Sequence, residues 1–573
     1  MSTISASRQP ESLPGTDRPL PRTPERPGLS DGRHGLMPAT RQVGALLLAA
    51  AWLGLGMLPA TASSQQLRWA AQAEVQTLDP HAQNHPQTQA VLQHVYESLT
   101  RYTPHLQLEP ALASSWQMLS PLVWRFNIRR GVHFHDGAPL TAEDVVFSLE
   151  RIQEANSPLS AQFTSIRTVR RVDDFLIEIV LDKPAPLLPR YLADARIMSK
   201  RWAVANKVSK AQNLKSGEVG FSARHANGTG PFRLESWAPG QPLHLDRNPQ
   251  WWDSAGFPGN LKGFSYRAIA SDEARIRALQ RGEIDLVTDV PSQRVPAIQG
   301  NRRLKLATDV AQRTLLIGMD QGSARLQHAQ AGAHNPFQDQ RVRHAMSLAI
   351  DMRTLYRITH GTYRPAGTII APGVTGWTPE LDQRPPRNLP LARQLMQKAG
   401  YGQGFSVTLD CPNNRYAYDQ EICQALVPMF ARIGIRLQIN SQPFASLVPK
   451  LETLDSSLWM IGWGSPDNDA LHNLLSLAYT RSDKVDGTYN AARISDPRLD
   501  RVINAARYES QPDKRLALLQ QALQIVKDQY YYLPLRHATR SWVMNRHIQL
   551  LAPTTERPDM RFVKMRSARP GQR

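Results

Sequence analysis

The most regular pattern of apolar and polar positions lies between Trp124 and Ile152. From Trp124 to Arg129 the two kinds of residue alternate strictly, which is the period of a β-strand with one buried face. Turn-forming glycines follow, and apolar residues then recur at helical spacing up to Ile152. Thr141 is placed to cap this helix, and Asp144 lies near its positive end. The pattern predicts a strand, a turn and a capped helix in immediate succession.

Strand and helix periods alternate along most of the remaining chain. A strand and a turn are predicted at 67–78, and further strands at 175–181 and 405–411. Helices are predicted at 90–99, 272–282, 337–350, 391–400, 422–433, 499–506 and 516–526. Residues 203–228 are polar and have no clear period, which predicts a loop. This alternation is typical of α/β domains with mixed sheets. A chain of 573 residues is too long for one hydrophobic core, so two or three domains are expected.

The N-terminal region predicts export. Val43 to Leu58 is apolar and uncharged, follows Arg41 and precedes the small residues 60–62, which together indicate a secretory signal peptide cleaved after Ala62. The run is shorter than the ~20 residues of a membrane-spanning helix, although a retained anchor helix is the alternative. Met37 is a candidate for the true start. No cysteine lies near the cleavage point, so a periplasmic protein without a lipid anchor is expected.

The charge of the chain is strongly positive. Its 68 Lys and Arg against 49 Asp and Glu give a net charge of +19, which could indicate nucleic acid or acidic lipid as a partner. The basic residues are dispersed, however, and form no block of five or six like charges. Solvated surfaces explain them better, and no nucleic-acid partner is expected.

Cys411 and Cys423 are the only cysteines. An even count in an oxidising compartment allows a disulfide. Cys411 ends a predicted strand and Cys423 lies on a predicted helix, so a short strand–loop–helix excursion can bring them together. Closing so short a loop would contribute about 3 kcal/mol. Two free buried cysteines are the alternative.

Several short sequences occur in an order that is typical of one family. They are TLDP (77–80), VYESLTRY (95–102), the 124–152 segment, GTGPF (228–232), RALQRGEIDL, NPFQDQRVRHAMSLAID (335–351) and RYAYDQEICQALVPMFARIGI. In their number and order they resemble the family 5 extracytoplasmic solute-binding proteins, which are peptide, opine and nickel receptors of ABC importers.

The resemblance implies an α/β fold, a two-lobed periplasmic-binding-protein clamshell with mixed sheets and an extra subdomain inserted in lobe I. The lobes of such proteins close on a ligand by a hinge motion. After a leader at 1–62, lobe I would comprise 63–104, 229–311 and 536–573, the inserted subdomain 105–228 and lobe II 312–535. The hinge would lie at the crossovers near 311 and 535.

The implied function is that of a monomeric periplasmic receptor. It would capture a peptide or peptide-like small molecule without a cofactor and deliver it to an inner-membrane ABC permease. In peptide-binding relatives an arginine of lobe II pairs with the ligand carboxylate, and Arg415 matches its position. A guanidinium can grip a carboxylate with two parallel bonds. A solvated loop arginine is the alternative.

The relatives also place an acid shortly after a Gly-Trp dipeptide to bind the ligand amine. Here Trp463 can offer a flat apolar wall, but the position three residues later is Pro466. Asp467 and Asp469 are near substitutes, and this departure leaves amine recognition open.

Tyr416 and Tyr418 could line the same cleft or serve only in packing. An opine, a nickel chelate or haem is the alternative ligand, and a ligand-sensing protein for a membrane receptor is the alternative class.

Metal and catalytic sites are not predicted. His133 and His135 would share one strand face beside Asp136, which is a possible metal set, but a turn at Asp136-Gly137 explains the acid and favours a structural use. The chain has no Gly-x-Ser-x-Gly elbow, His-Glu-x-x-His, P-loop or Cys-x-x-Cys. No catalytic residue is therefore assigned, and the protein is not expected to be an enzyme.

Overall fold

The computed structural model describes residues 65–217, 219–288, 290, 294, 295, 298, 300–361, 364–482, 486–552 and 557–566. The predicted leader at 1–62, with Met37 and the cleavage point after Ala62, lies outside the described residues. Among those that are described, no helix has the length and apolarity that a membrane crossing requires.

The Trp124–Ile152 pattern forms the strand and the helix that it predicts. The strand is β5, Val123–Ile128, and the helix is α2, Ala142–Ile152. Their apolar side chains share one core. Thr141 and Asp144 form a capping box, in which the Thr141 N–H donates to Asp144 Oδ2 over 2.9 Å. The strand belongs to an antiparallel sheet of order β4-β5-β7-β6, with β4 Ala113–Ser120, β6 Ile166–Asp173 and β7 Leu176–Leu181.

A buried ion pair ties α2 to the TLDP segment. Arg151 donates from Nη1 and Nη2 to the two oxygens of Asp79 over 2.8 and 2.5 Å, and both side chains are essentially unexposed. The same carboxylate accepts the backbone N–H groups of His81 and Gln212 and the hydroxyl of Ser222. Burial alone would raise the pKa of Asp79, but Arg151 and the other donors outweigh it and hold the pKa below its usual value.

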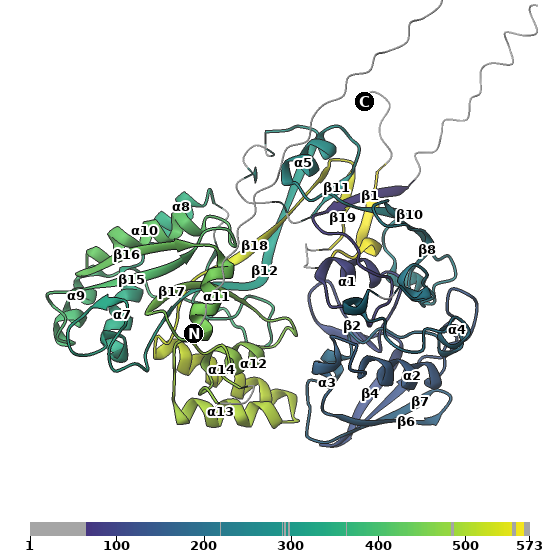
Figure 1. Ribbon diagram of the computed structural model, residues 1–573, viewed down its shortest axis with the longest axis horizontal. Coiled ribbons are helices and arrows are strands. Elements are labelled where there is room, and N and C mark those ends of the chain that lie inside the picture. Colours follow the sequence, from purple (N-terminus) through teal and green to yellow (C-terminus); the bar gives the residue numbers. More distant parts are fainter. Residues whose placement is uncertain are drawn as a thin grey trace, which may run out of the picture. The chain divides into compact units, whose positions relative to one another are not determined.

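A larger mixed sheet has the order β13-β15-β17-β12-β18-β11-β1-β10-β9-β8, with β16 paired to β15 and β14 to β18. Its centre is a long antiparallel pair, β12 Leu304–Met319 and β18 Leu533–Asn545, which lie side by side in Figure 1. On one side follow β1 Gln66–Ala71, β8 Phe232–Ser236, β9 Leu243–Arg247, β10 Gly263–Ala268 and β11 Leu286–Val287. On the β12 side follow β13 Ala329–Gln330, β15 Phe405–Pro412, β16 Ile435–Gln442 and β17 Leu458–Gly464. The short β14, Arg364–Pro365, pairs with the opposite edge of β18.

The pairing of β12 with β18 is interrupted at two places. The ladder skips residues 311–313 of β12 at the first and Leu535 of β18 at the second. Irregularities of this kind bend a strand locally. The positions near 311 and 535, where the family resemblance places the hinge, coincide with this irregular pairing. The hinge itself stays a prediction.

Helices cover both faces of the strands around β15 and β17 and enclose two separate cores (Figure 1). They are α7 Gln340–Ala349, α8 Met352–Ile358, α9 Leu389–Lys398, α10 Asp419–Ala431, α11 Phe444–Glu452, α12 Ala470–Asn473, α13 Pro497–Tyr508 and α14 Pro512–Asp528. The structure confirms, within a few residues at each end, the helices predicted at 337–350, 391–400, 422–433, 499–506 and 516–526.

The first predicted helix is wrong in position. The apolar spacing predicts it at 90–99, whereas α1 spans Pro86–Leu92. Proline suits the first helical position because its missing N–H is not needed there. Residues 203–228, predicted as a loop, begin with the end of a helix, and the rest of the range, as far as the structure describes it, contains only short 3₁₀ turns. The remaining short elements are β2 Thr100–Tyr102, β3 Leu108–Pro110, α3 Leu188–Tyr191, α4 Lys200–Ala205, α5 Asp272–Gln280, β19 Ile548–Leu550 and β20 Val563–Met565.

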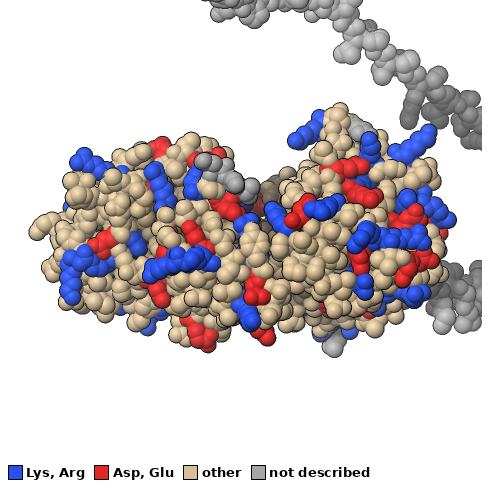
Figure 2. Space-filling view, turned by 90° about the horizontal axis from the view of Figure 1, so that it is seen from below, with Lys and Arg blue, Asp and Glu red and all other residues tan. Residues whose placement is uncertain are grey.

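Charged side chains of both signs are interspersed on the face of the molecule that Figure 2 shows. No extended block of a single sign covers that face. This distribution agrees with the interpretation of the positive net charge as dispersed over solvated surface.

The two cysteines are joined. Cys411 lies near the end of β15 and Cys423 lies inside α10, and a disulfide connects them with their Cα atoms 6.5 Å apart. Both side chains are fully buried. The bond ties the strand to the helix that packs on it, across a loop of 12 positions that contains Arg415 and Tyr416.

Replacing both cysteines by alanine should lower the free energy of unfolding by about 3 kcal/mol, because the bond removes the freedom of this loop in the unfolded chain. The measurement is chemical denaturation of wild type and variant, each with and without a thiol reductant. Reductant should destabilise only the wild type, and an equal effect on both proteins would contradict the prediction.

Candidate functional site

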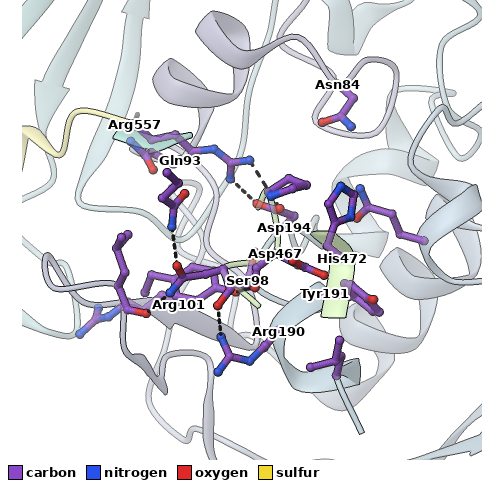
Figure 3. Close-up of a pocket in the computed structure, with 18 of the residues that line it drawn as sticks. Asn84, Gln93, Ser98, Arg101, Arg190, Tyr191, Asp194, Asp467, His472 and Arg557 are labelled. Carbon is purple, nitrogen blue, oxygen red and sulfur yellow. Dashed lines mark hydrogen bonds and ion pairs between the residues drawn. The ribbon is translucent and has the colours of Figure 1, made fainter. Parts of the chain in front are cut away.

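A cavity of ≈ 1070 Å³ lies within the described structure. It is slightly larger than the roughly 300–1000 Å³ of most small-molecule sites. Most of its lining residues fall in 84–111, 161–196, 466–489 and 542–563. The third of these segments follows β17. The others lie in the part of the molecule that contains β1 and the four-stranded sheet β4-β5-β7-β6. Residues that the resemblance assigns to lobe I and to lobe II therefore face the same space (Figure 3).

Asp467 contributes a carboxylate to this cavity from the loop after β17. Its Oδ1 accepts the backbone N–H of Asp469 over 3.2 Å. Burial, reinforced by the negative charge of Asp469, raises the pKa of Asp467 to about 7. A carboxyl group with such a pKa readily takes up either a proton or a cationic group at neutral pH.

Asp469 has a different task. Its side chain is fully buried and accepts two bonds from Arg515, over 2.8 and 2.9 Å. It also accepts the Leu471 N–H over 3.0 Å and so caps α12. Of the two acids considered as substitutes for the amine-binding residue, only Asp467 belongs to the cavity lining.

Trp463 lies behind the cavity wall instead of forming it. It is on β17, and its ring stacks on His472 at 6.3 Å and meets Tyr489 at 5.0 Å between ring centroids. His472 and Tyr489 themselves line the cavity. The next lining residues, Leu475 and Ser476, lie in a short π-helix, Leu474–Ala478, an element that is frequent at functional sites.

Arg415 and Tyr416 lie outside the cavity lining. Arg415 is exposed, and its guanidinium carbon is 5.4 Å from the centre of the Phe444 ring. The Tyr416 hydroxyl accepts the Gly462 N–H over 2.8 Å, which fixes the loop to β17. Tyr418 is buried in the core beneath α10. Both tyrosines thus have packing contacts, while a ligand-binding role of Tyr416 and the carboxylate-binding role of Arg415 stay predictions.

Six arginines line the cavity, and sequence reasoning did not assign any of them to the site. Five have a carboxylate oxygen within 4.0 Å, namely Arg101, Arg190, Arg507, Arg557 and Arg561. The sixth, Arg196, has none among the described residues. These arginines are spread from 101 to 561, so no local pattern marks them. The one usable signal is VYESLTRY, a family landmark that supplies the lining residues Glu97, Ser98 and Arg101.

Hydrogen bonds connect residues between 102 and 190 with the loop after β17 and with Thr375. Tyr102 donates its hydroxyl to the Asp467 carbonyl over 3.3 Å, and Asn468 Nδ2 donates to the Leu106 carbonyl over 2.8 Å. Arg190 Nη2 donates to Thr375 Oγ1 over 2.8 Å. The loop that carries Asp467 is therefore held by both sides of the cavity.

The histidines weighed as metal ligands have structural partners. His135 Nε2 lies 3.1 Å from the Gly230 carbonyl, and burial lowers the pKa of this imidazole to about 4, so it is neutral. His133 forms an isolated β-bridge with Pro139. Among the described residues no group of three His, Cys, Asp or Glu side chains is arranged to hold a metal ion.

Comparison with known proteins gives consistent matches. The model of the bacterial extracellular solute-binding proteins, family 5 (middle), matches residues 107–484. The chain is 24% identical over 488 residues to the glutathione-binding protein GsiB of Salmonella choleraesuis (strain SC-B67), covering 82% of this chain and 90% of that protein.

Solved structures match with similar coverage. HbpA2 from Haemophilus parasuis has a TM-score of 0.75 and 21% identity over 87% of this chain and all of its own. The periplasmic murein tripeptide-binding protein MppA, in its unliganded open form, has a TM-score of 0.73 and 22% identity over 88% and 96% of the two chains. The fold is that of the two-lobed periplasmic binding proteins, as the family resemblance implies.

Proposed function

Because this chain belongs to the family 5 bacterial extracellular solute-binding proteins, which serve as receptors of ABC importers, we propose that it captures a peptide-like small molecule in the described cavity. It then hands the ligand unchanged to an inner-membrane permease. The observation that carries the proposal is the large cavity, which is lined by residues from both sides of the β12–β18 pair. One wall holds Asp467, whose pKa is raised to about 7. The names of the similar proteins GsiB and MppA, which refer to glutathione and a murein tripeptide, support a peptide-like ligand.

The proposal extends to compartment and assembly. The family is extracellular, and we propose that the chain is exported by the signal peptide expected before Ser63 and acts in the periplasm as a monomer. Lobe I would comprise 63–104, 229–311 and 536–573, the inserted subdomain 105–228 and lobe II 312–535. The interrupted pairing at 311–313 and Leu535 supports the hinge positions between the lobes.

Asp467 is the proposed partner of the ligand amine. Its raised pKa shows that the charged carboxylate is disfavoured in the ligand-free protein, and an ammonium group beside it would stabilise this charged form. Trp463 would act by holding the rings of His472 and Tyr489 against the ligand. Bridging water in so large a space would let side chains of different size be accepted.

The first experiment is native mass spectrometry of residues 63–573 exported to a bacterial periplasm, followed by denaturation and identification of what is released. We expect an intact peptide or amino-acid derivative. Release of an opine, a nickel chelate or haem would show that the ligand is not peptide-like. Release of a cleaved ligand would favour a hydrolase. A membrane-receptor sensor, the alternative class, would leave uptake unchanged in a deletion strain.

Arg415→Ala tests the carboxylate role that the family resemblance implies. If Arg415 grips the ligand carboxylate when the lobes close, the variant should bind a peptide such as glutathione about 10- to 150-fold more weakly, since bonds to charged groups are worth roughly 1.5–3 kcal/mol. Isothermal titration calorimetry measures this. Arg432→Ala removes an exposed arginine at the end of α10 and serves as control. Equal affinity of Arg415→Ala and wild type would remove Arg415 from the site.

A further inference from the structure

Arg196 is a buried cation of the cavity wall without an anionic partner among the described residues. Its backbone forms a β-bridge with Ser98, and only 6% of the residue is exposed. Nη1 donates to Ser98 Oγ over 3.3 Å, while the buried Nε has no hydrogen-bond partner in the described structure. The other five arginines of the lining each have a carboxylate within 4.0 Å.

The nearest acids are already engaged. Asp194 is paired with Arg557, as the dashed contact in Figure 3 shows. Glu97 accepts the Thr229 hydroxyl over 2.8 Å and the Trp252 Nε1–H over 3.0 Å. Burial lowers the pKa of Arg196 to about 10, and Asp194 and Glu97 offset this only in part. Arg196 is therefore charged at neutral pH and incompletely neutralised.

A buried charge in this condition destabilises the protein that carries it. It also has the geometry that a ligand anion needs, because a guanidinium presents a planar fork of donors to a carboxylate. The Ser98 hydroxyl, which accepts from Arg196 and donates to no described residue, can give its proton to the same anion. Asp467 lies in the same cavity lining, on the loop after β17.

We propose that Arg196, assisted by Ser98, holds a carboxylate of the ligand, so that the receptor selects acidic peptide-like molecules. This inference rests on the proposed function. The amine of such a ligand would be held by Asp467, and its acidic side chain or terminus would be held on the opposite, lobe I wall. In this arrangement both lobes provide charged contacts, whereas Arg415 and Asp467 would provide them from lobe II alone.

The test compares peptides that differ only in the acid. Wild type, Arg196→Met and Arg196→Lys are titrated with glutathione and with two matched pairs, Ala-Glu-Ala and Ala-Gln-Ala, and Glu-Ala-Ala and Gln-Ala-Ala. Arg277→Met is the control, since it removes the same charge from an exposed position of α5 outside the cavity. Thermal unfolding of each ligand-free protein is recorded alongside.

Wild type and Arg277→Met should bind the better glutamate peptide at least tenfold more tightly than its glutamine partner. Arg196→Met should lose this preference, and its ligand-free Tm should rise, because an uncompensated buried charge is gone. Arg196→Lys should keep the preference in weakened form, since the charge remains and the fork is lost.

Three results would overturn the inference. The first is equal binding of both members of each peptide pair by wild type. The second is an undiminished preference of Arg196→Met for the glutamate peptide. The third is a lowered Tm of Arg196→Met together with a glutamate preference of Arg196→Lys at wild-type strength, which would indicate a purely structural arginine. If Arg196→Met does not fold, the wild-type and Arg196→Lys preferences decide alone. Failure of wild type to bind glutathione and all four peptides would instead reject the proposed function, and the inference with it.

Discussion

Asp79→Ala should lower the free energy of unfolding by about 3–5 kcal/mol, the loss typical when one partner of a buried ion pair is removed. The variant leaves Arg151 charged in the interior, and it also takes the acceptor from the His81 and Gln212 N–H groups and the Ser222 hydroxyl. Denaturant unfolding, followed by the tryptophan fluorescence of the chain, measures the effect.

A double variant sharpens this prediction. Asp79→Ala/Arg151→Met removes both charges, so it should recover part of the lost stability, because no unpaired charge remains. Asp182→Ala is the surface control. It removes an acid that pairs with Arg167 in solvent, where such a pair contributes about 0–1 kcal/mol. A loss for Asp79→Ala as small as that of the control would show that the buried network is dispensable.

Asp467→Asn should weaken the binding of an amine-bearing peptide such as glutathione about 100-fold, since truncating a buried charged contact typically costs about 2–5 kcal/mol. The amide keeps the shape of the side chain but cannot carry the charge that pairs with an ammonium. Isothermal titration calorimetry gives the affinity, and Asp513→Asn, an exposed acid in the first turn of α14, is the control. Unchanged affinity in Asp467→Asn would exclude the amine-binding role.

The raised pKa of Asp467 also fixes a pH dependence. The unfolded chain loses this proton near pH 4, whereas the ligand-free folded protein keeps it up to about pH 7. This group therefore lowers stability as the pH rises from about 4 to about 7, and Asp467→Asn should remove that component. Because an amine ligand favours the charged carboxylate, its affinity for wild type should fall as the pH drops below about 7, with proton release on binding. A pH-independent affinity would contradict this.

Local patterns could be predicted from the sequence wherever the cause is local. The alternation before Arg129 and the Thr141–Asp144 cap depend on neighbouring residues, and the structure reproduces both. The fold class followed from the order of the family landmarks. The placement of the helix at 90–99 failed because its start is set by Pro86, which apolar spacing alone does not reveal.

The site was only partly predictable because its parts meet through tertiary structure. Asp467 was identified from its position after Trp463, but which of the nearby acids faces the cavity depends on the bond of Asp469 to Arg515, 46 positions away. Arg196 and Ser98 are 98 positions apart and meet through a single β-bridge. Dispersed arginines look like solvated surface in a sequence, and only the fold shows that six of them line one cavity.

The Asp79–Arg151 pair also limits how this protein can be recombined. Its donors come from the residues after Asp79, from α2 and from the segment 208–222, so the proposed insertion, 105–228, shares one buried network with the residues that precede it. A chimera that grafts 105–228 from a relative must bring an arginine and a matching return segment to an aspartate that stays behind. Grafts that respect this junction should express as folded protein, and those that break it should accumulate as inclusion bodies. The proposed insertion is therefore exchangeable only for one that supplies the same partners to Asp79.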